Sequence, residues 1–263
     1  MSNFWTWWTS PYSPNPQTAQ HPTNIKYWDY DIVSWVYGQL KSAGLSDNAV
    51  AGLLGNIHWE SGICPYKCEG ISIVNQSLNE TVNRVVPASR SEFINQRYAG
   101  GTGYSLAQWS YVRKGDFYDY GSWNLIGTEY QIQRDLGFLL QDLQNFPETT
   151  SVAESLWSAQ GKTVWQWLTD PNVSLYDALQ AVLMIYEKPF KTLPVTQSAW
   201  YTEWHDQRLA PANDILQNFA GVTPPPTPPI PPTPPTPTPT NGLPIWMYFK
   251  LKGGYKADEQ ILS

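Results

Sequence analysis

Residues 51–65 read AGLLGNIHWESGICP, a stretch that decides the expected fold because it carries one carboxylate, Glu60, at the end of an apolar helix. Apolar residues recur at helical spacing ahead of this carboxylate, at Val50, Leu53, Leu54 and Ile57. Ser46 occupies the place of an N-cap, and Gly62 stands where helices commonly end. The pattern therefore predicts a helix over residues 46–60 with Glu60 in its last turn.

Glu60 is expected on the buried face of this helix. Seven residues span close to two turns, so Glu60 points within about 20° of Leu53. Lost hydration and the negative end of the helix dipole both raise the pKa of a carboxyl group. Protonation of a glycosidic oxygen requires a carboxylic acid that keeps its proton near neutral pH. We therefore predict that Glu60 is a catalytic acid. The alternative is a solvated glutamate, since a helix boundary shifted by two residues turns the side chain outward.

Three blocks of sequence resemble one known family. ESGICP at 60–65 resembles the E-S-x-x-x-P signature of the lysozyme superfamily, which includes goose-type lysozymes, lytic transglycosylases and phage tail-tip lysozymes, and GLLGNI at 52–57 resembles the tail-lysozyme version. GYSLAQW at 103–109 is similar to the G-[YF]-G-L-x-Q-W element of the glycan cleft, and IYEKP at 185–189 to a late Y-E-[RK]-P element. The blocks keep the family order. Ser105 stands where the family usually has glycine, which predicts a slightly different turn.

The resemblance implies a fold and a set of site residues. The fold is α+β and mostly α, a lysozyme-like domain with a small sheet or loop wall beside the cleft. Tyr104, Gln108 and Trp109 are expected to face the glycan, and Tyr186 to lie near it. Gln108 offers a donor and an acceptor to sugar groups, and Trp109 offers a stacking face, although a tryptophan there is also a normal core residue. For Glu187, a surface ion pair with Lys188 is the favoured interpretation.

The second carboxylate of a glycosidase pair is not identified by any motif. Glu69, Glu80, Glu92 and Asp116 all lie in the expected loop region, and their spacing does not choose among them. A lytic transglycosylase returns the proton through the same acid and uses the substrate's own groups. Hydrolase and lytic transglycosylase therefore both stay open.

Charge and composition exclude several classes of function. The net charge is −6 and no basic cluster occurs, so a surface that follows nucleic-acid phosphates is not expected. No apolar run is long enough to span a bilayer. The 14 Trp and 16 Tyr suit a glycan-binding protein, although protein interfaces use the same residues. The N-terminus lacks a secretory signal, which predicts assembly in the host cytoplasm and a place in a virion.

The two cysteines, Cys64 and Cys68, follow the Glu60 helix. A disulfide across so short a loop is geometrically possible, and two free thiols are the alternative. A metal site needs further ligands that His58 alone does not supply, so no metal and no cofactor is expected. A cysteine peptidase is disfavoured because the only histidines, His21, His58 and His205, stand in no peptidase motif.

Composition divides the chain into four parts. Residues 1–28 are aromatic and Pro-rich and are expected to form an extended arm, and the resemblance implies a lysozyme-like domain over residues 29–222. Residues 223–240 alternate Pro and Thr and predict a semi-rigid polyproline II linker reaching about 50 Å. Residues 241–263 are too few for a core of their own and predict a docking peptide. The arm and the peptide are expected to bind other phage tail proteins.

Within the domain, helical patterns are separated by one irregular region. Helices are expected at 29–43, 46–60, 128–146, 151–168, 174–188, 196–209 and 212–219, with Pro211 in the first turn of the last. Loops and a short sheet are expected over residues 64–123.

These features together predict a peptidoglycan glycosidase, a muramidase that cuts the β-1,4 bond between N-acetylmuramic acid and N-acetylglucosamine, on the tail tip of a phage virion. A lytic transglycosylase with the same acid is one alternative. A non-catalytic glycan-binding or structural tail module is the other, in which Glu60 has no chemical role.

Overall fold

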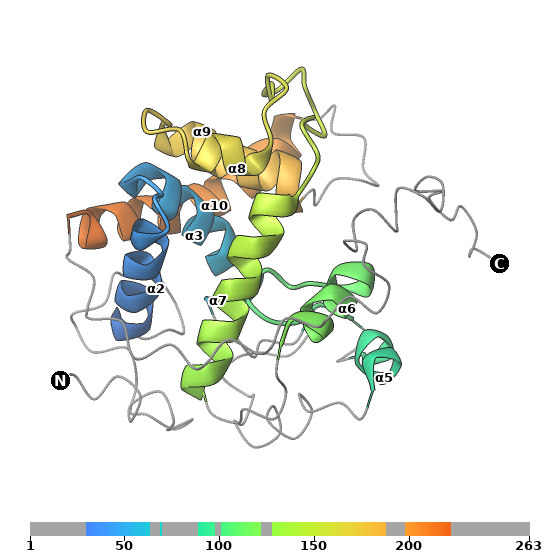
Figure 1. Ribbon diagram of the computed structural model, residues 1–263. Helices are drawn as coiled ribbons and strands as arrows, with labels where there is room; N and C mark the ends of the chain where they lie inside the picture. The colour runs from blue at the N-terminus through green and yellow to red at the C-terminus, as the bar shows by residue number, and fades with distance from the viewer. Residues whose placement is uncertain are drawn as a thin grey trace, which may run out of the picture. The chain divides into compact units, whose positions relative to one another are not determined.

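The computed structural model describes residues 30–63, 69, 89–97, 101–121, 128–187 and 198–221 (Figure 1). All of them lie in the first of the two units into which the chain divides, Met1–Pro228 and Pro229–Ser263. The predicted arm, linker and docking peptide lie outside the described residues, as do Cys64, Cys68 and Glu80, so what was expected of them stays a prediction.

The described part is 65% helix and contains no strand, which confirms a mostly α fold. Its helices are α2 (Tyr30–Ser42), α3 (Asp47–Ser61), α5 (Arg90–Asn95), α6 (Tyr111–Tyr120), α7 (Thr128–Asn145), α8 (Val164–Leu168), α9 (Leu175–Ala181), the π-helix η2 (Val182–Glu187) and α10 (Ser198–Phe219). The described part holds an isolated bridge between Tyr104 and Trp109, and the expected sheet or loop wall stays a prediction. No helix in it is long and apolar enough to cross a membrane.

Helix α3 lies against α10 and α9, and two glycines of the AGLLGN stretch make that contact close. A Cβ atom on Gly52 would lie 2.8 Å from the Cβ of Ala178, and one on Gly55 would lie 2.6 Å from the Cβ of Ala212. Distances this short exclude any larger residue without a backbone shift. Small residues at these positions therefore set how near α9 and α10 come to the helix that carries Glu60.

The long α7 runs down the middle of Figure 1, with α5 and α6 on one side and α8 near its upper end. The helix predicted over residues 128–146 is confirmed, since α7 ends at Asn145, shortly before Pro147. Its apolar stripe is buried, at Ile132, Leu136, Leu139 and Leu143. On the other side of the view lies α2, which ends as expected before Gly44, where φ is +95°.

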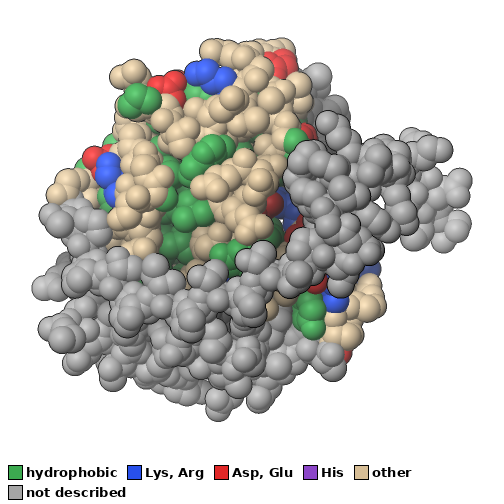
Figure 2. Space-filling model, viewed as in Figure 1, with side chains coloured by type: hydrophobic (Ala, Val, Ile, Leu, Met, Phe, Trp, Pro, Cys, Tyr) green, Lys and Arg blue, Asp and Glu red, His purple; other side chains and the backbone are tan. Residues whose placement is uncertain are grey.

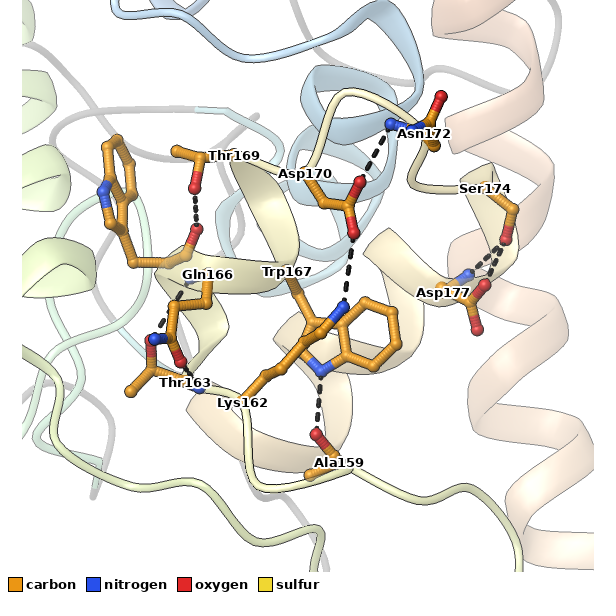
Figure 3. Close-up of polar contacts among 11 residues, drawn as sticks. Ala159, Lys162, Thr163, Gln166, Trp167, Thr169, Asp170, Asn172, Ser174 and Asp177 are labelled. Atoms are coloured by element: carbon orange, nitrogen blue, oxygen red, sulfur yellow. Dashed lines mark hydrogen bonds and ion pairs between the residues drawn. The ribbon is translucent and has the colours of Figure 1, made fainter.

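The expected helix over residues 151–168 is wrong in most of its length. Turns occupy residues 152–156, and Gln160 and Gly161 both have positive φ, which breaks the helical path. Helix starts only at Val164, where Thr163 and Gln166 form a capping box (Figure 3). Ser174 caps α9 in the same close-up by accepting a hydrogen bond from the Asp177 N–H.

Two other predictions are corrected by the helices. Residues 64–123 were expected to be loops and a short sheet, yet α5 and α6 lie there, preceded by Ser89 and Ser110 in N-cap position. These helices are short, and Phe93 of α5 and Phe117 of α6 pack in one aromatic cluster with Tyr104, Trp109 and Phe138. Residues 196–219 were expected as two helices, yet α10 is continuous, with Pro211 inside it.

Candidate active site

Glu60 lies in the last turn of α3, as predicted. The Ser46 side chain accepts a hydrogen bond from the Ala49 N–H, and Gly62 closes the helix with a left-handed φ of 65°. The Glu60 side chain is mostly buried, with 21% of its surface exposed. Burial raises the pKa of Glu60 above its ordinary value. A mostly buried carboxyl group at a helix end is thus available as a proton donor.

Arg208 of α10 is the ion-pair partner of Glu60. Its Nη2 donates to Glu60 Oε1 at 2.6 Å, and its own side chain is fully buried. The Arg208 charge opposes the rise in the pKa of Glu60, but burial has the larger effect. Burial also lowers the pKa of Arg208 itself. The raised pKa of Glu60 and the lowered pKa of Arg208 have one cause. For each group, the loss of hydration destabilises the charged form more than the ion pair stabilises it.

Glu187 is a second carboxylic acid close to Glu60. Burial and the negative charge of Glu60 raise the pKa of Glu187 to about 8. Its Oε1 is buried and has no hydrogen-bond partner among the described residues. The buried Oε1 argues against the expected surface position of Glu187, and the ion pair with Lys188 stays a prediction because Lys188 lies outside the described residues. Two carboxyl groups close together in a buried site do not both ionise readily, because their negative charges repel.

A partly buried hydrogen-bond network surrounds Tyr186, the residue before Glu187. The Tyr186 hydroxyl donates to Asp142 Oδ2 at 2.6 Å, and Arg113 donates to the same oxygen at 2.7 Å. The Arg113 guanidinium stacks on the Tyr186 ring, 4.1 Å from its centroid. Trp109 Nε1 donates to the Tyr186 hydroxyl at 3.3 Å. This network joins α6, α7, η2 and the Tyr104–Trp109 bridge, and it includes Tyr186, the residue before Glu187.

Three of the four predicted substrate-binding side chains are buried. Tyr104, Trp109 and Tyr186 are each at most 2% exposed. Gln108 is half-buried, and its side-chain amide donates to the Ser105 carbonyl at 2.7 Å. The structure brings Trp109 and Tyr186 together, but their burial favours support of the site over contact with a sugar. Their role in substrate binding stays a prediction.

Ser105 adopts the backbone conformation that glycine favours, with φ of 70°. Its hydroxyl is buried and donates to Asp135 Oδ2, which also forms an ion pair with Arg134 through its other oxygen. Burial raises the pKa of Asp135 to about 6. Ser105 thus adopts the left-handed conformation, and its hydrogen bond to Asp135, which glycine cannot form, offsets the cost of that conformation.

The described candidates for a second carboxylate differ in position. Glu92 lies at the start of α5, where its N–H is capped by Ser89. Asp116 lies on α6, 3.7 Å from Arg90. Glu69 is exposed, and its charge adds to the rise in the pKa of Glu60.

An exposed tryptophan stands next to the acid. Trp59 precedes Glu60 on α3 and is 44% exposed, and the Arg208 guanidinium carbon lies 5.6 Å from its ring centroid. On the face shown in Figure 2, acidic and basic side chains lie next to one another at the edge of the grey atoms, beside a hydrophobic area. Within the described part of the chain, no cluster of three or more His, Cys, Asp or Glu is placed to hold a metal ion.

Sequence reasoning missed Arg208 and misjudged Glu187. A signal for Arg208 was present, because it falls on the buried stripe of α10 formed by His205, Ala212, Ile215 and Phe219. A charged residue on such a stripe needs a buried partner. No comparable pattern marks the partner as Glu60, which lies on another helix.

Comparison with known proteins gives one match. The model of a family described as phage tail lysozyme matches residues 33–219, a span that contains Glu60, Glu187 and Arg208. No curated protein and no solved structure matches the chain.

Proposed function

Because the chain belongs to the phage tail lysozyme family, we propose that it is a muramidase that cuts the β-1,4 bond between N-acetylmuramic acid and N-acetylglucosamine, with Glu60 as the acid. Membership supports a lysozyme-like, peptidoglycan-degrading function and association with the virion. The observation that carries the proposal is the mostly buried Glu60, whose pKa is raised by burial.

The proposed step moves one proton. As the bond between the anomeric carbon and the bridging oxygen breaks, its electron pair goes to that oxygen, which takes the proton of Glu60. Negative charge then develops on Glu60. Arg208, already 2.6 Å away, stabilises that charge without having to move.

A protonated Glu187 adds no second negative charge beside Glu60. With one proton on the pair of carboxyl groups, the remaining carboxylate balances the charge of Arg208, and the buried group is neutral. Loss of that proton would leave two carboxylates facing one guanidinium, which burial disfavours. The pKa of about 8 for Glu187 is consistent with retention of the proton at neutral pH.

Substrate contacts are proposed from exposure. Trp59 offers an open aromatic face beside the acid, on which a sugar ring can stack. Gln108 is only half-buried and is the predicted cleft residue best placed to reach a sugar. In the virion we place the protein at the tail tip, held by other tail proteins through residues 1–28 and 241–263, where it opens the wall locally during infection.

The test is digestion of purified peptidoglycan by the wild type and by Glu60→Gln, with products identified by mass. The matched control is Glu154→Gln, because Glu154 is an exposed carboxylate in the loop between α7 and α8. We expect glycan cleavage to fall by about 10²-fold or more in Glu60→Gln and to be unchanged in the control.

Equal cleavage by the wild type and Glu60→Gln would remove Glu60 from the mechanism. Absence of cleavage by the wild type, with binding to the wall retained, would instead favour a non-catalytic tail module. A reducing sugar end identifies a hydrolase, whereas a 1,6-anhydro end identifies a lytic transglycosylase.

A further inference from the structure

Glu69 is held by the backbone that leads into the Tyr104–Trp109 bridge. Its Oε2 accepts hydrogen bonds from the Thr102 and Gly103 N–H groups, both at 2.8 Å. Its own N–H donates to the Gly103 carbonyl at 2.9 Å. Three hydrogen bonds thus fix both the backbone and the carboxylate of one exposed residue.

The glycines on either side of Thr102 make room for this carboxylate. A Cβ atom on Gly101 would lie 2.3 Å from Cδ of Glu69, and one on Gly103 would lie 3.1 Å from its Oε2. A side chain at position 101 would therefore displace the carboxylate, and one at 103 would press on it. The Gly-Thr-Gly segment is shaped around the Glu69 side chain.

The same backbone leads to the proposed acid. Gly103 is followed by Tyr104, which pairs with Trp109 through N–H···O bonds of 3.0 and 2.9 Å. Trp109 donates to Tyr186, which precedes Glu187. The charge of Glu69 acts on Glu60, and the charge of Glu60 acts on Glu187. A second carboxylate is thus fixed to the wall of the site that holds the acid.

On the basis of the proposed function, we propose that Glu69 is the general base that activates water in an inverting hydrolysis. Water forms the new bond to the anomeric carbon and gives one proton to Glu69. The bond to the bridging oxygen breaks on the opposite face, and its electron pair takes the proton of Glu60. Glu60 ends deprotonated and Glu69 protonated, so one water is consumed and the protons balance.

Two features suit Glu69 to this role. A base that takes a proton from water must reach solvent, and Glu69 is exposed whereas Glu187 has a buried carboxylate oxygen. Both backbone N–H groups bind Oε2, which fixes the direction of the carboxylate and leaves Oε1 for water. Glu187 is protonated up to about pH 8, so it is a poor base at neutral pH.

The experiment compares the wild type, Glu69→Gln, Glu60→Gln and Glu154→Gln on purified peptidoglycan and on a soluble glycan fragment. Glu154 is the matched control because it too is exposed and accepts N–H bonds from the backbone, at Ser151 and Ala159. The readouts are the rate, the first-formed anomer by NMR, the pH profile of kcat/KM, and the unfolding temperature.

We expect the wild type to release the α anomer from the β-linked glycan. Glu69→Gln should lose about 10²-fold or more in rate and lose the acidic limb of its pH profile, since that limb reports the base. Its unfolding temperature should stay close to that of Glu154→Gln.

Three outcomes would overturn the role of Glu69: a rate for Glu69→Gln within about threefold of the wild type, a β-anomer product, or a 1,6-anhydro product. A Glu69→Gln that unfolds early and keeps its acidic limb would assign the residue a structural role only. If Glu60→Gln is inactive while Glu69→Gln is active, the inference fails and the proposed function stands. If Glu60→Gln keeps full activity, the proposed function itself fails.

Discussion

Arg208 Nη2 and Glu60 Oε1 lie 2.6 Å apart, although the two residues are 148 positions apart in the sequence. The contact joins the last turn of α3 to the buried stripe of α10, which α3 approaches closely at Gly55. It also sets the electrostatics of the proposed acid, because Arg208 opposes the effect of burial on the pKa of Glu60.

Replacement of Arg208 by methionine should shift the alkaline limb of kcat/KM to higher pH. The guanidinium lowers the pKa of Glu60, so its removal raises that pKa, and Glu60 acts in its protonated form. Arg208→Lys keeps the charge and should shift the limb less. An alkaline limb that stays in place in Arg208→Met would separate this ion pair from the chemistry.

Glu187→Gln should flatten the pH dependence of stability. Native Glu187 keeps its proton up to about pH 8, whereas an ordinary glutamate releases it near 4.5. Between these values the native state binds more protons than the unfolded chain, so the free energy of unfolding falls as pH rises, by at most about 1.4 kcal/mol per pH unit. Denaturant titrations at several pH values measure this slope.

The contribution of Glu187 is fully present below about pH 4.5 and is lost as pH rises through about 8. Asp135, whose pKa is raised to about 6, gives a slope of the same sign in both proteins, so the comparison isolates Glu187. Identical slopes for the wild type and Glu187→Gln would contradict a protonated Glu187 at neutral pH.

Ser105→Ala and Ser105→Gly separate turn strain from hydrogen bonding. Both lose the hydrogen bond to buried Asp135, which should cost about 1–3 kcal/mol of unfolding free energy. Only glycine relieves the positive φ of 70°, so Ser105→Gly should be more stable than Ser105→Ala by about 1 kcal/mol. Thermal unfolding measures the difference, and the reverse order of stability would disprove the strain at Ser105.

Tyr186→Phe and Trp59→Ala test which aromatic residues bind the glycan. Tyr186 is buried and donates to Asp142, so loss of its hydroxyl should cost about 1 kcal/mol of stability with KM almost unchanged. Trp59 is exposed, so Trp59→Ala should raise KM by about 3- to 10-fold with little loss of stability. Steady-state kinetics and thermal unfolding give both quantities. A large change of KM in Tyr186→Phe would restore Tyr186 as a substrate-binding residue.

Local signals in the sequence predicted the helix that carries Glu60. The Ser46 cap, the apolar spacing and Gly62 all act within a few residues, and the structure confirms each. The same reasoning failed at Pro211. Because proline has no backbone N–H, it predicted the start of a new helix there. In the structure α10 is continuous through Pro211, and Arg208 and Ala212 on either side of it pack against Gly55.

Long-range contacts account for the rest. No local pattern pairs Glu60 with Arg208, and none indicates that Glu187 has a buried oxygen while its neighbour in sequence is a lysine. The sequence does not distinguish Glu69 from the other three candidate carboxylates, because its hydrogen bonds to Thr102 and Gly103 join residues more than 30 positions apart. Contacts between residues far apart in the sequence can be assigned only once the fold is known.

The most direct test of Glu60 as proton donor compares two leaving groups in the wild type and Glu60→Gln. One substrate is a natural glycan oligomer, whose leaving oxygen needs a proton, and the other is its dinitrophenyl glycoside, whose leaving group does not. We predict that Glu60→Gln loses about 10²-fold or more of kcat/KM on the glycan and less than about tenfold on the dinitrophenyl glycoside. Equal losses on both substrates, or no loss on the glycan, would contradict Glu60 as the acid.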